Sequence, residues 1–320
     1  MNLKEQKIQE FSTLLDENSY YNCKCVVCNG SEFEQLAAID RYGFRYKPGI
    51  CKTCGNIQQI EYYKPEILSN FYANFYSYIY RDGITLDQTF AKQQRKGREI
   101  LSYCEAVLPP KGSVLDIGCS CGGVLSIFKQ NGYECIGCDY DKNYLAFGRS
   151  KGLELYNDGV ESLPPAKLFD LIILRHVLEH IPDPVDFLSE IIPLLKPNGH
   201  IYIEVPAIEN VVDGGYDFNF SAYFQNAHFI HFTTYSLKNV ASLSGLQIIK
   251  SNRYIKSLVT TVPKLQQRDL EFTDGYEYAR FQMDLGNQRR NSFYRYYLDF
   301  KKYVKKILKK IIMPVIMFLK

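Results

Sequence analysis

The chain of 320 residues lacks any run of about 18 consecutive apolar residues, which is the length that a membrane-spanning helix requires. Its first residues, MNLKEQKIQEFSTLLDENS, are charged and lack the apolar core of a secretory signal peptide. We therefore expect a protein of the reducing cytoplasm, in which the ten cysteines do not form disulfides. A chain of this length buries enough core to be stable without them.

The chain also lacks an excess of basic residues outside its C-terminal stretch. Its net charge is +3, but the stretch from Arg289 to Lys320 contains ten Lys and Arg residues against one acid, Asp299. The remaining residues include 28 basic and 34 acidic side chains and are therefore slightly acidic. Because nucleic-acid affinity comes largely from contacts between cations and phosphates, we expect no nucleic acid among the partners.

Four of the cysteines form two pairs with the spacing of zinc knuckles. Cys25 and Cys28 form one C-x-x-C pair, and Cys51 and Cys54 form the second pair after an interval of 22 residues. Four thiolates around one zinc ion make a structural site, since no coordination position stays open for a substrate. We predict such a site here, while uncoordinated thiols in a small insert are the alternative and Cys23 is a surplus ligand candidate.

Aromatic residues crowd the segment 62–80. Tyr72, Tyr76 and Tyr80 recur at intervals of four residues, which places them on one face of a helix, and Arg81 follows them. Such a stripe is common in core packing, but tyrosine also suits a cavity wall that must be apolar and polar at once. We predict that these four residues bind the substrate.

From residue 111 onward, short apolar segments alternate with amphipathic ones. The pattern predicts strands over 114–118, 135–139, 153–156, 169–177 and 200–206 and helices over 124–130, 141–151 and 183–195. This alternation is typical of an α/β fold with a doubly wound parallel sheet, whose ligands bind beyond the carboxyl ends of the strands. We interpret Glu179 and His180 as structural residues that close the turn before Pro184.

The stretch VLDIGCSCGG, from Val114 to Gly123, predicts a buried strand that turns sharply into a helix. Its small residues leave backbone N–H groups open to a ligand. Asp116 lies near the end of this strand, and Asp139 ends the next one, where an acid accepts hydrogen bonds from ribose hydroxyls. Ser120 stands where a dinucleotide fingerprint needs glycine, so we expect a different nucleoside cofactor. An ordinary strand–turn–helix corner with two capping acids is the alternative.

Together with RHVLEHIPDP at 175–184 and LLKPNGHIYIEVP at 194–206, this stretch resembles the class I S-adenosylmethionine-dependent methyltransferases. With its four N-terminal cysteines, the chain is similar to zinc-ribbon methyltransferases that include sugar C-methyltransferases and enzymes of bacterial surface-polysaccharide pathways. The resemblance implies a Rossmann-like seven-stranded sheet with a small N-terminal zinc-binding module and a helical connector. It also implies S-adenosylmethionine as the cofactor, bound by Asp116, Gly118, Ser120, Gly122, Asp139, Asp158, Arg175 and His176.

A second resemblance concerns catalysis. AHFIHFTTYSL at 227–237 resembles the family's EHxxYFS segment, whose histidine is proposed as the base in the sugar C-methyltransferases. His228 matches that histidine, while Ala227 and His231 replace the family's glutamate and tyrosine. The resemblance implies His228 as the base, with His231 and Tyr223 as further catalytic candidates. A histidine that is packed within a loop is the alternative.

The domain organisation predicted from these segments has four parts. Residues 1–60 form the N-terminal helix and zinc ribbon, 61–110 the tyrosine-rich connector, 111–262 the methyltransferase domain and 263–320 a C-terminal extension. The extension ends in a basic amphipathic segment, YVKKILKKIIMPVIMFLK, that suits an anionic membrane surface. A docked helix or a disordered basic tail is the alternative.

The resemblance implies a methyltransferase that acts on a small carbohydrate-type substrate, nucleotide-linked or lipid-linked, in surface-polysaccharide biosynthesis. We place it in the cytoplasm, with a peripheral contact at the inner membrane face as an option. A zinc-ribbon RNA-modifying methyltransferase and a non-catalytic relative that binds S-adenosylmethionine are the alternative functions.

Overall fold

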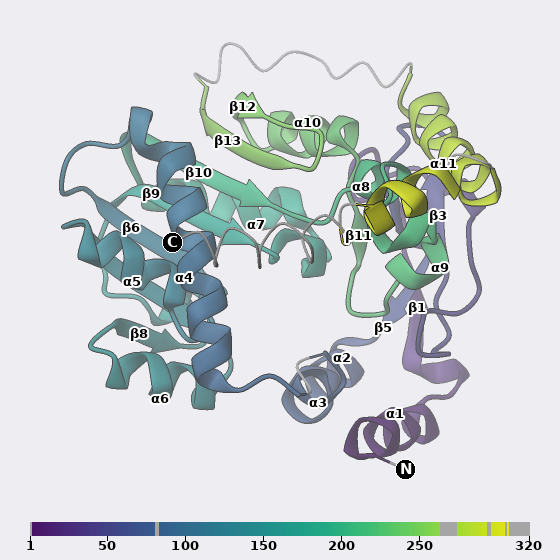
Figure 1. The fold of residues 1–320 in the computed structure, drawn as a ribbon, viewed down its shortest axis with the longest axis horizontal. Helices are drawn as coiled ribbons and strands as arrows, with labels where there is room; N and C mark the ends of the chain where they lie inside the picture. Colours follow the sequence, from purple (N-terminus) through teal and green to yellow (C-terminus); the bar gives the residue numbers. More distant parts are fainter. Residues whose placement is uncertain (1, 81–82, 263–273, 293–295, 305, 307–320) are drawn as a thin grey trace.

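The computed structural model describes residues 2–80, 83–262, 274–292, 296–304 and 306 (Figure 1). Arg81, one of the predicted substrate-binding residues, lies outside the described residues, as does most of the predicted basic tail. Within the described ranges, no helix combines the length and the apolarity that crossing a bilayer requires.

The larger sheet contains seven strands in the order β12-β13-β10-β9-β6-β7-β8. The strands from β10 to β8 run parallel to their neighbours, whereas β13 runs antiparallel to both β10 and β12. This order confirms the predicted Rossmann-like seven-stranded sheet. The strands are β6 (Ser113–Ile117), β7 (Glu134–Asp139), β8 (Glu154–Asn157), β9 (Phe169–Arg175), β10 (Leu195–Glu204), β12 (Leu246–Ser251) and β13 (Lys256–Thr261).

Helices cover both faces of this sheet, which is why its central strands are apolar along most of their length. One face packs against α4 (Leu86–Cys104), α5 (Gly123–Gln130) and α6 (Lys142–Ser150), and the other against α7 (Pro184–Ile191) and α10 (Thr234–Leu243). The strand order reverses at β6, which has β7 on one side and β9 on the other. Ligands of such sheets bind at the carboxyl ends of the strands beside this reversal.

The N-terminal part forms a separate small sheet at the right of Figure 1. Strands β2 (Phe33–Gln35), β3 (Pro48–Cys51) and β4 (Ile57–Gln59) pair antiparallel, and β11 (Ile230–His231) joins them at the edge of β4. We call residues 20–63 with their four paired cysteines the cysteine module. It begins and ends with β1 (Tyr20–Asn22) and β5 (Glu61–Tyr63), which pair with each other, and α1 (Leu3–Leu14) precedes it.

The tyrosine-rich connector forms two short helices, α2 (Pro65–Asn74) and α3 (Tyr76–Tyr80), instead of one continuous helix. Phe75 between them has a backbone φ of −128°, outside the helical range. Its side chain is buried against Phe11 of α1, with ring centroids 5.0 Å apart. The break therefore lets the connector pack against α1 while the tyrosines remain in ring contact with one another.

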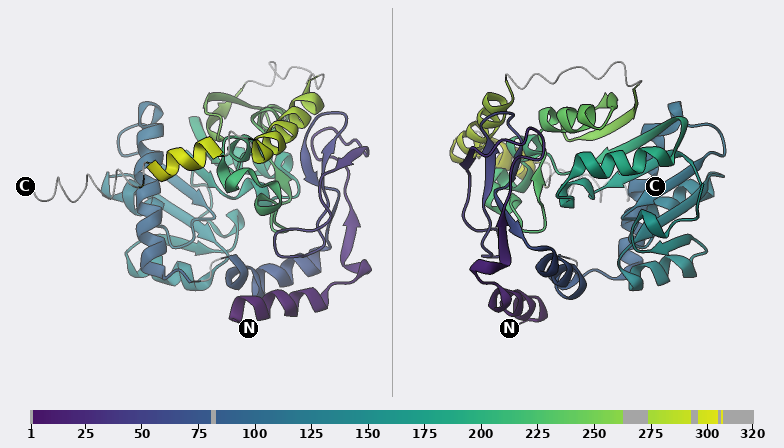
Figure 2. Two further views of the ribbon diagram at one scale, coloured as in Figure 1. Left: turned by 45° about the vertical axis from the view of Figure 1, so that its right-hand side comes forward. Right: turned by 180° about the vertical axis from the view of Figure 1, so that it is seen from behind.

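The C-terminal part ties the two sheets together. Helices α8 (Ile208–Val212) and α9 (Phe220–Tyr223) follow β10, and α11 (Gly275–Asn291) packs against α8 and β3. Figure 2 shows α11 from two sides, lying against the cysteine module. Tyr276 and Arg280 of α11 both contact the Glu34 carboxylate in β2, which fixes the helix across the module.

We predict that Gly55→Ala destabilises the protein far more than Gly43→Ala. Both glycines have a left-handed φ, +73° and +85°, so both substitutions incur the same backbone strain. A Cβ at Gly55 would lie 1.9 Å from the carbonyl oxygen of Gly275, whereas nothing lies within 4 Å of a Cβ at Gly43. We expect losses of about 1 kcal/mol at Gly43 and about 3 kcal/mol or more at Gly55. Urea unfolding monitored by circular dichroism measures both, and equal losses would contradict the close approach of α11.

Candidate active site

The loop after β6 has the geometry of a nucleoside-binding turn. Gly118 and Gly122 adopt φ of +73°, and Ser120 between them adopts φ of +53°. The two glycines accept this left-handed backbone without strain, while serine does not. Ser120 is nevertheless held there, because its N–H donates to the Asp139 carboxylate over 2.8 Å. The sequence singled out all three positions, and the structure brings them together at one strand end.

Asp139 fixes the opposite side of this loop. Its second carboxylate oxygen accepts a hydrogen bond from the Asp141 N–H at 2.9 Å, so two backbone amides orient the group. The Asp158 N–H donates to the Asp139 carbonyl at 3.1 Å, and Asp158 has φ of +98° with an exposed side chain. The two acids predicted to bind ribose and adenine therefore lie next to each other, at the ends of β7 and β8.

Asp116 lies behind the loop and is only 3% exposed. Burial raises the pKa of its carboxyl group to about 8, with Arg175 nearby lowering it and Asp139 raising it. Within the described part of the chain, its carboxyl oxygens make no hydrogen bond that would offset the burial. The free enzyme thus keeps a protonated carboxyl group at the carboxyl end of β6 near neutral pH.

Helix α4 supplies a residue that the sequence analysis missed. The Gln93 side-chain oxygen accepts a hydrogen bond of 2.8 Å from the Gly123 N–H at the start of α5. A Cβ at Gly123 would lie 2.5 Å from the Phe90 carbonyl oxygen, so only glycine permits this approach of α4 and α5. Gln93 thereby takes one of the free N–H groups at the helix start, and no local sequence motif reports such a contact.

Arg175 and His176 end β9 beside the loop, as predicted. The Arg175 Nε is buried without a hydrogen bond and lies 3.9 Å from the Glu204 carboxylate at the end of β10. Lys96 of α4 lies 3.5 Å from the same carboxylate. Although burial disfavours the charged form, the hydrogen bond from Tyr202 and the charge of Arg175 lower the pKa of Glu204. Cationic groups therefore border the strand ends where the resemblance places the methionine part of the cofactor.

A buried polar group follows β9 in the turn η4 (Leu178–His180). The Glu179 carboxylate, 1% exposed, lies 3.2 Å from His176 Nδ1, 4.0 Å from His180 Nε2 and 3.9 Å from His228 Nε2. We call Glu179, His180 and His228 the histidine cluster. The sequence analysis assigned Glu179 and His180 a structural role, whereas the structure places them beside the predicted base.

His228 is 4% exposed, and burial lowers its pKa well below 6.5, as do the neighbouring histidines. It is therefore neutral at pH 7. Gln225 contacts His228 Nε2, and the Gln225 oxygen in turn accepts from Arg41 of the cysteine module. His180 Nδ1 lies 2.9 Å from the Ala227 carbonyl oxygen, which fixes its ring and leaves Nε2 directed toward Glu179.

The three groups of the histidine cluster lie close enough to hold a metal ion, with ligand atoms within 4.8 Å of one another. The contact of Gln225 with His228 Nε2 competes with that use, because it occupies the nitrogen that faces Glu179. The arrangement fits proton transfer better, since a neutral imidazole faces a buried carboxylate.

The predicted tyrosines line one side of the histidine cluster. The Tyr72 hydroxyl lies 3.1 Å from His180 Nδ1. Tyr76 stacks on Tyr80 with ring centroids 5.0 Å apart and meets the His180 ring edge-on at 6.0 Å. The Tyr80 hydroxyl donates to the side-chain oxygen of Asn226. The three tyrosines therefore cover one side of the histidine cluster, although they come from two helices.

Tyr223 and His231 lie deeper, in the packing between the two sheets. The Tyr223 hydroxyl donates to the Pro206 carbonyl oxygen at 3.1 Å, and its ring contacts His231 at 5.0 Å. His231 contacts the Tyr46 hydroxyl of the cysteine module, and burial lowers its pKa to about 3. The centroids of the His228 and His231 rings are 5.9 Å apart. Tyr223 and His231 therefore pack behind the histidine cluster.

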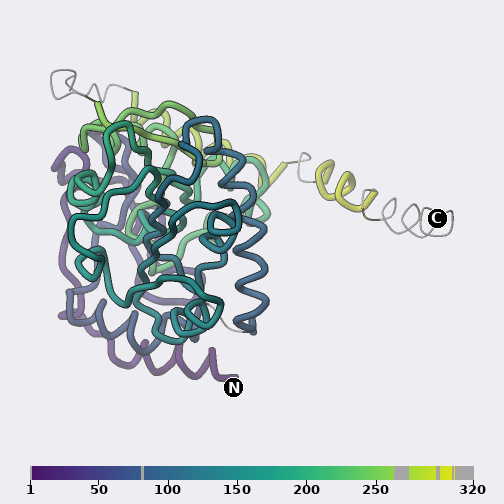
Figure 3. The backbone as a smooth tube through the Cα atoms, turned by 90° about the vertical axis from the view of Figure 1, so that its left-hand side faces the viewer, coloured from purple at the N-terminus to yellow at the C-terminus, as the bar shows by residue number. Residues whose placement is uncertain are grey.

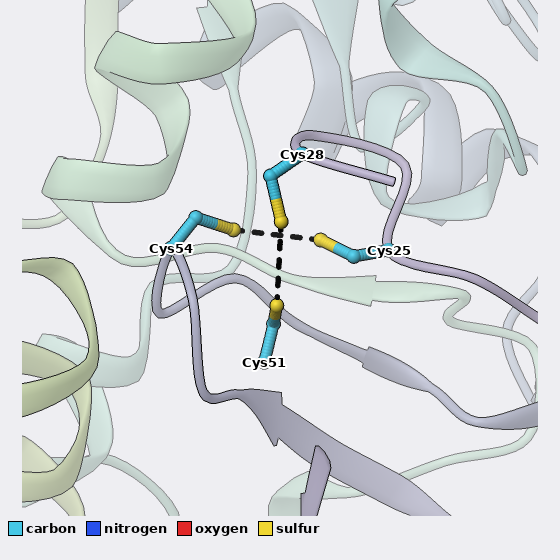
Figure 4. A group of neighbouring side chains, drawn as sticks. All are labelled: Cys25, Cys28, Cys51 and Cys54. Carbon is cyan, nitrogen blue, oxygen red and sulfur yellow. Dashed lines mark hydrogen bonds between the residues drawn. The ribbon is translucent and has the colours of Figure 1, made fainter. Parts of the chain in front are cut away.

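The four paired cysteines point toward one centre (Figure 4). The Sγ atoms of Cys25 and Cys54 are 3.4 Å apart, and those of Cys28 and Cys51 are 3.5 Å apart. A tetrahedral zinc ion with Zn–S bonds of about 2.3 Å needs sulfur–sulfur distances of about 3.8 Å, so the arrangement is compatible with zinc. Cys23 lies outside this group, its thiol directed at the Tyr21 carbonyl oxygen.

We predict that Cys51→Ser lowers the zinc content of the purified protein from about one ion to near zero per chain. The substitution removes one of four thiolates from the module core, and we expect a loss of about 4 kcal/mol in unfolding free energy. Plasma mass spectrometry and thermal denaturation measure both effects. Cys23→Ser is the matched control, because the same atom changes outside the group; an equal zinc loss in both variants would contradict the assignment.

We predict that Asp116→Asn makes the stability of the ligand-free protein less dependent on pH. The pKa of the folded state, about 8, exceeds the ordinary value of 3.8. The protonated carboxyl group is therefore favoured by folding, and its contribution is lost as the pH rises toward 8. Between pH 5 and pH 8 the wild type should lose up to about 4 kcal/mol more than the variant. Thermal melts across this range test it, and parallel pH curves would contradict it.

The sequence is similar to several known methyltransferases. The model of the family described as methyltransferase domain matches residues 90–251, which include most of α4, the loop after β6 and the histidine cluster. A tRNA U34 carboxymethyltransferase from Pseudoalteromonas translucida is 32% identical over 136 residues, 40% of this chain and 41% of that protein. The C-methyltransferase NovU from Streptomyces niveus is 24% identical over 206 residues, 62% of this chain and 46% of NovU. The chain thus spans less than half the length of these relatives.

Among solved structures, an S-adenosylmethionine-dependent methyltransferase from Clostridium acetobutylicum is 14% identical, with a TM-score of 0.43 over 61% of this chain and 99% of that chain. S-adenosylmethionine-bound CalS10, an amino pentose methyltransferase from Micromonospora echinaspora, is 13% identical, with a TM-score of 0.40 over 57% of this chain and 94% of that chain. Since the family model covers half of the sequence and all of the strands from β6 to β10, the chain belongs to the methyltransferase domain family.

Proposed function

We propose that the protein is an S-adenosylmethionine-dependent methyltransferase that acts on a small carbohydrate-type acceptor, nucleotide-linked or lipid-linked, in surface-polysaccharide biosynthesis. Its family membership supports the cofactor and the reaction class. The main support for the position of the acceptor site is the histidine cluster. It is buried at the end of β9 and packs against Tyr72, Tyr76 and Tyr80. The similarity to the C-methyltransferase NovU, which extends over 206 residues, supports methyl transfer to carbon as one form of this reaction.

When bound, S-adenosylmethionine supplies an electrophilic methyl group on a sulfonium centre. In this proposal Asp139 accepts hydrogen bonds from the ribose, Asp158 lies near the adenine, and the loop of Gly118, Ser120 and Gly122 supports the nucleoside. Arg175 and His176 border the methionine part, and Asp116 lies beneath it. Because methyl transfer requires in-line alignment, the main task of these residues is to hold donor and acceptor in position.

His228 is the proposed general base, since burial keeps it neutral, and an acceptor hydroxyl that displaces the Gln225 contact at Nε2 can give its proton to that nitrogen. Glu179 lies 3.9 Å from its Nε2 and stabilises the imidazolium when the proton arrives. His180 is held by Ala227 and Tyr72 through its Nδ1, and its Nε2 lies on the side of Glu179, where it can orient an acceptor hydroxyl. Tyr223 and His231 keep the segment of His228 in place from behind.

The cysteine module has a structural role in this proposal, with zinc bound by Cys25, Cys28, Cys51 and Cys54. It supports the acceptor site directly, because Arg41 of the module contacts Gln225, the neighbour of His228. Tyr42 and Tyr80 flank the Arg41 guanidinium at 4.9 and 5.5 Å from their ring centres. The module and the connector therefore meet at the acceptor side of the site.

An RNA acceptor is the second candidate, because one similar protein is a tRNA-modifying enzyme. The slightly acidic body outside the C-terminal stretch disfavours it. Filter binding of total RNA at low and moderate salt separates the two candidates, and tight binding that weakens with salt would favour RNA.

The proposal is tested by incubating the protein with S-adenosylmethionine and a panel of nucleotide-linked and lipid-linked sugars. We expect a mass gain of one CH₂ group on a sugar together with formation of S-adenosylhomocysteine. Calorimetry with S-adenosylmethionine accompanies the assay. A protein that binds the cofactor but methylates neither sugars nor RNA is a non-catalytic relative, and absence of cofactor binding at millimolar concentration would contradict the proposal altogether. Methylation of RNA instead of any sugar would replace the acceptor class.

We predict that His228→Ala lowers kcat by about 10²–10⁴-fold, the usual contribution of a general base. The affinity for the cofactor should stay within about threefold, because His228 lies on the acceptor side. Glu179→Gln should lower kcat less and move the acid limb of the pH–rate profile to lower pH, since it removes the charge that favours the imidazolium. His200→Gln, a histidine on β10 outside the cluster, is the control. Unchanged turnover in His228→Ala would contradict the assignment of the base.

A further inference from the structure

The helix formed by residues 296–304 exposes a row of large aromatic side chains. Tyr296 is 71% exposed, Tyr297 54%, Phe300 59% and Tyr303 62%. Buried tyrosine and phenylalanine side chains stabilise a fold through their large apolar area, and these four leave most of that area to solvent. Figure 3 shows this helix projecting away from the body of the molecule.

These side chains occupy one face of the helix. At 100° per residue, Tyr296, Tyr297, Phe300, Tyr303 and Val304 fall within an arc of about 120°. Lys302 and Lys306 fall on the opposite side of the helix together with the half-buried Leu298, and Lys301 and Asp299 lie at the two borders. The helix therefore has an aromatic face that is largely exposed and an opposite side that is mainly polar.

The helix is linked to the body by its polar side. The Lys302 ammonium lies 3.5 Å from the Asp217 carboxylate in η6 (Gly215–Phe218), and both side chains are largely exposed. An exposed ion pair of this kind contributes little to stability, so the contact can yield to a competing anion. The sequence continues with Lys305, Lys306, Lys309 and Lys310 among Ile and Leu residues, of which only Lys306 belongs to the described residues.

The composition of this region fits one kind of surface in particular. Tyrosine rings are enriched where a bilayer meets water, because the ring is apolar and the hydroxyl is polar. The stretch from Arg289 to Lys320 contains ten cations and one acid, which a protein groove could neutralise only with a matching row of acids. A surface of anionic lipid headgroups neutralises these cations however the helix is rotated on it. A second copy of this strongly basic stretch would repel it.

We propose that helix 296–304 binds the surface of an anionic lipid bilayer. The face of Tyr296, Tyr297, Phe300 and Tyr303 enters the boundary between headgroups and acyl chains, and Lys301, Lys302 and Lys306 contact the headgroup phosphates. The contact is peripheral and reversible, since a short amphipathic helix buries too little apolar area for permanent insertion. This inference does not depend on the identity of the acceptor, but it would place the active site beside membrane-bound acceptors.

Vesicle co-sedimentation of the full-length protein tests the proposal. The probes are vesicles of phosphatidylcholine alone and vesicles with one quarter phosphatidylglycerol, each at low and high salt. We expect binding to the anionic vesicles that weakens with salt, because the lysine contacts are screened. Replacing Tyr296, Tyr297, Phe300 and Tyr303 together by serine should lower the partition coefficient at least tenfold. Lys301→Gln with Lys302→Gln should lower it roughly fivefold per lysine.

The matched control replaces two exposed aromatic residues elsewhere, Tyr254→Ser and Phe281→Ser, which are 48% and 58% exposed. All variants should keep the wild-type melting temperature, because the changed side chains lie on the surface. Equal vesicle binding by wild type and aromatic variant would overturn the proposal, as would equal binding to neutral and anionic vesicles. So would absence of vesicle binding by the wild type. If light scattering instead shows a dimer that the aromatic variant dissociates, the face binds a second copy.

Discussion

The pairing of β11 with β4 holds the candidate acceptor site against the cysteine module. Ile230 pairs with Gln58 and His231 with Ile57, and the Gln59 N–H donates to the Phe229 carbonyl oxygen. The Gln59 side-chain amide donates to the His228 carbonyl at 2.9 Å and to the Asn226 carbonyl at 3.1 Å. The segment that carries His228 therefore leads directly into β11, an edge strand of the sheet that carries Cys51, and its conformation depends on that sheet.

This shared sheet links the candidate zinc site to the proposed catalytic cluster. The cysteines fix the knuckles of β3 and β4, and β4 fixes the backbone around His228. On the other side, the Phe229 N–H donates to the Glu179 carbonyl, so the same segment also contacts the turn after β9. The cofactor side and the acceptor side meet at Glu179 and His228, within 4 Å of each other.

Much of this arrangement could be predicted from the sequence, because it depends on local patterns. Apolar periodicity located the strands from β6 to β10, the small residues after β6 located the sharp turn there, and spacing located the cysteine group. The roles of Glu179, His180 and Gln93 could not be predicted, since they arise from contacts between distant segments. Tyr72 reaches His180 across 108 residues, and Gln59 reaches His228 across 169. The break at Phe75 was also missed, because packing against α1 overrides the helical spacing of the tyrosines.

In the proposed function the histidine cluster faces the reacting methyl group. A crystal structure of the full-length protein with S-adenosylhomocysteine would show whether it does. We predict the ribose at Asp139 and the ligand sulfur directed toward His228, with the space between them open to an acceptor. A ligand bound elsewhere, or one whose sulfur faces away from Glu179, His180 and His228, would contradict it.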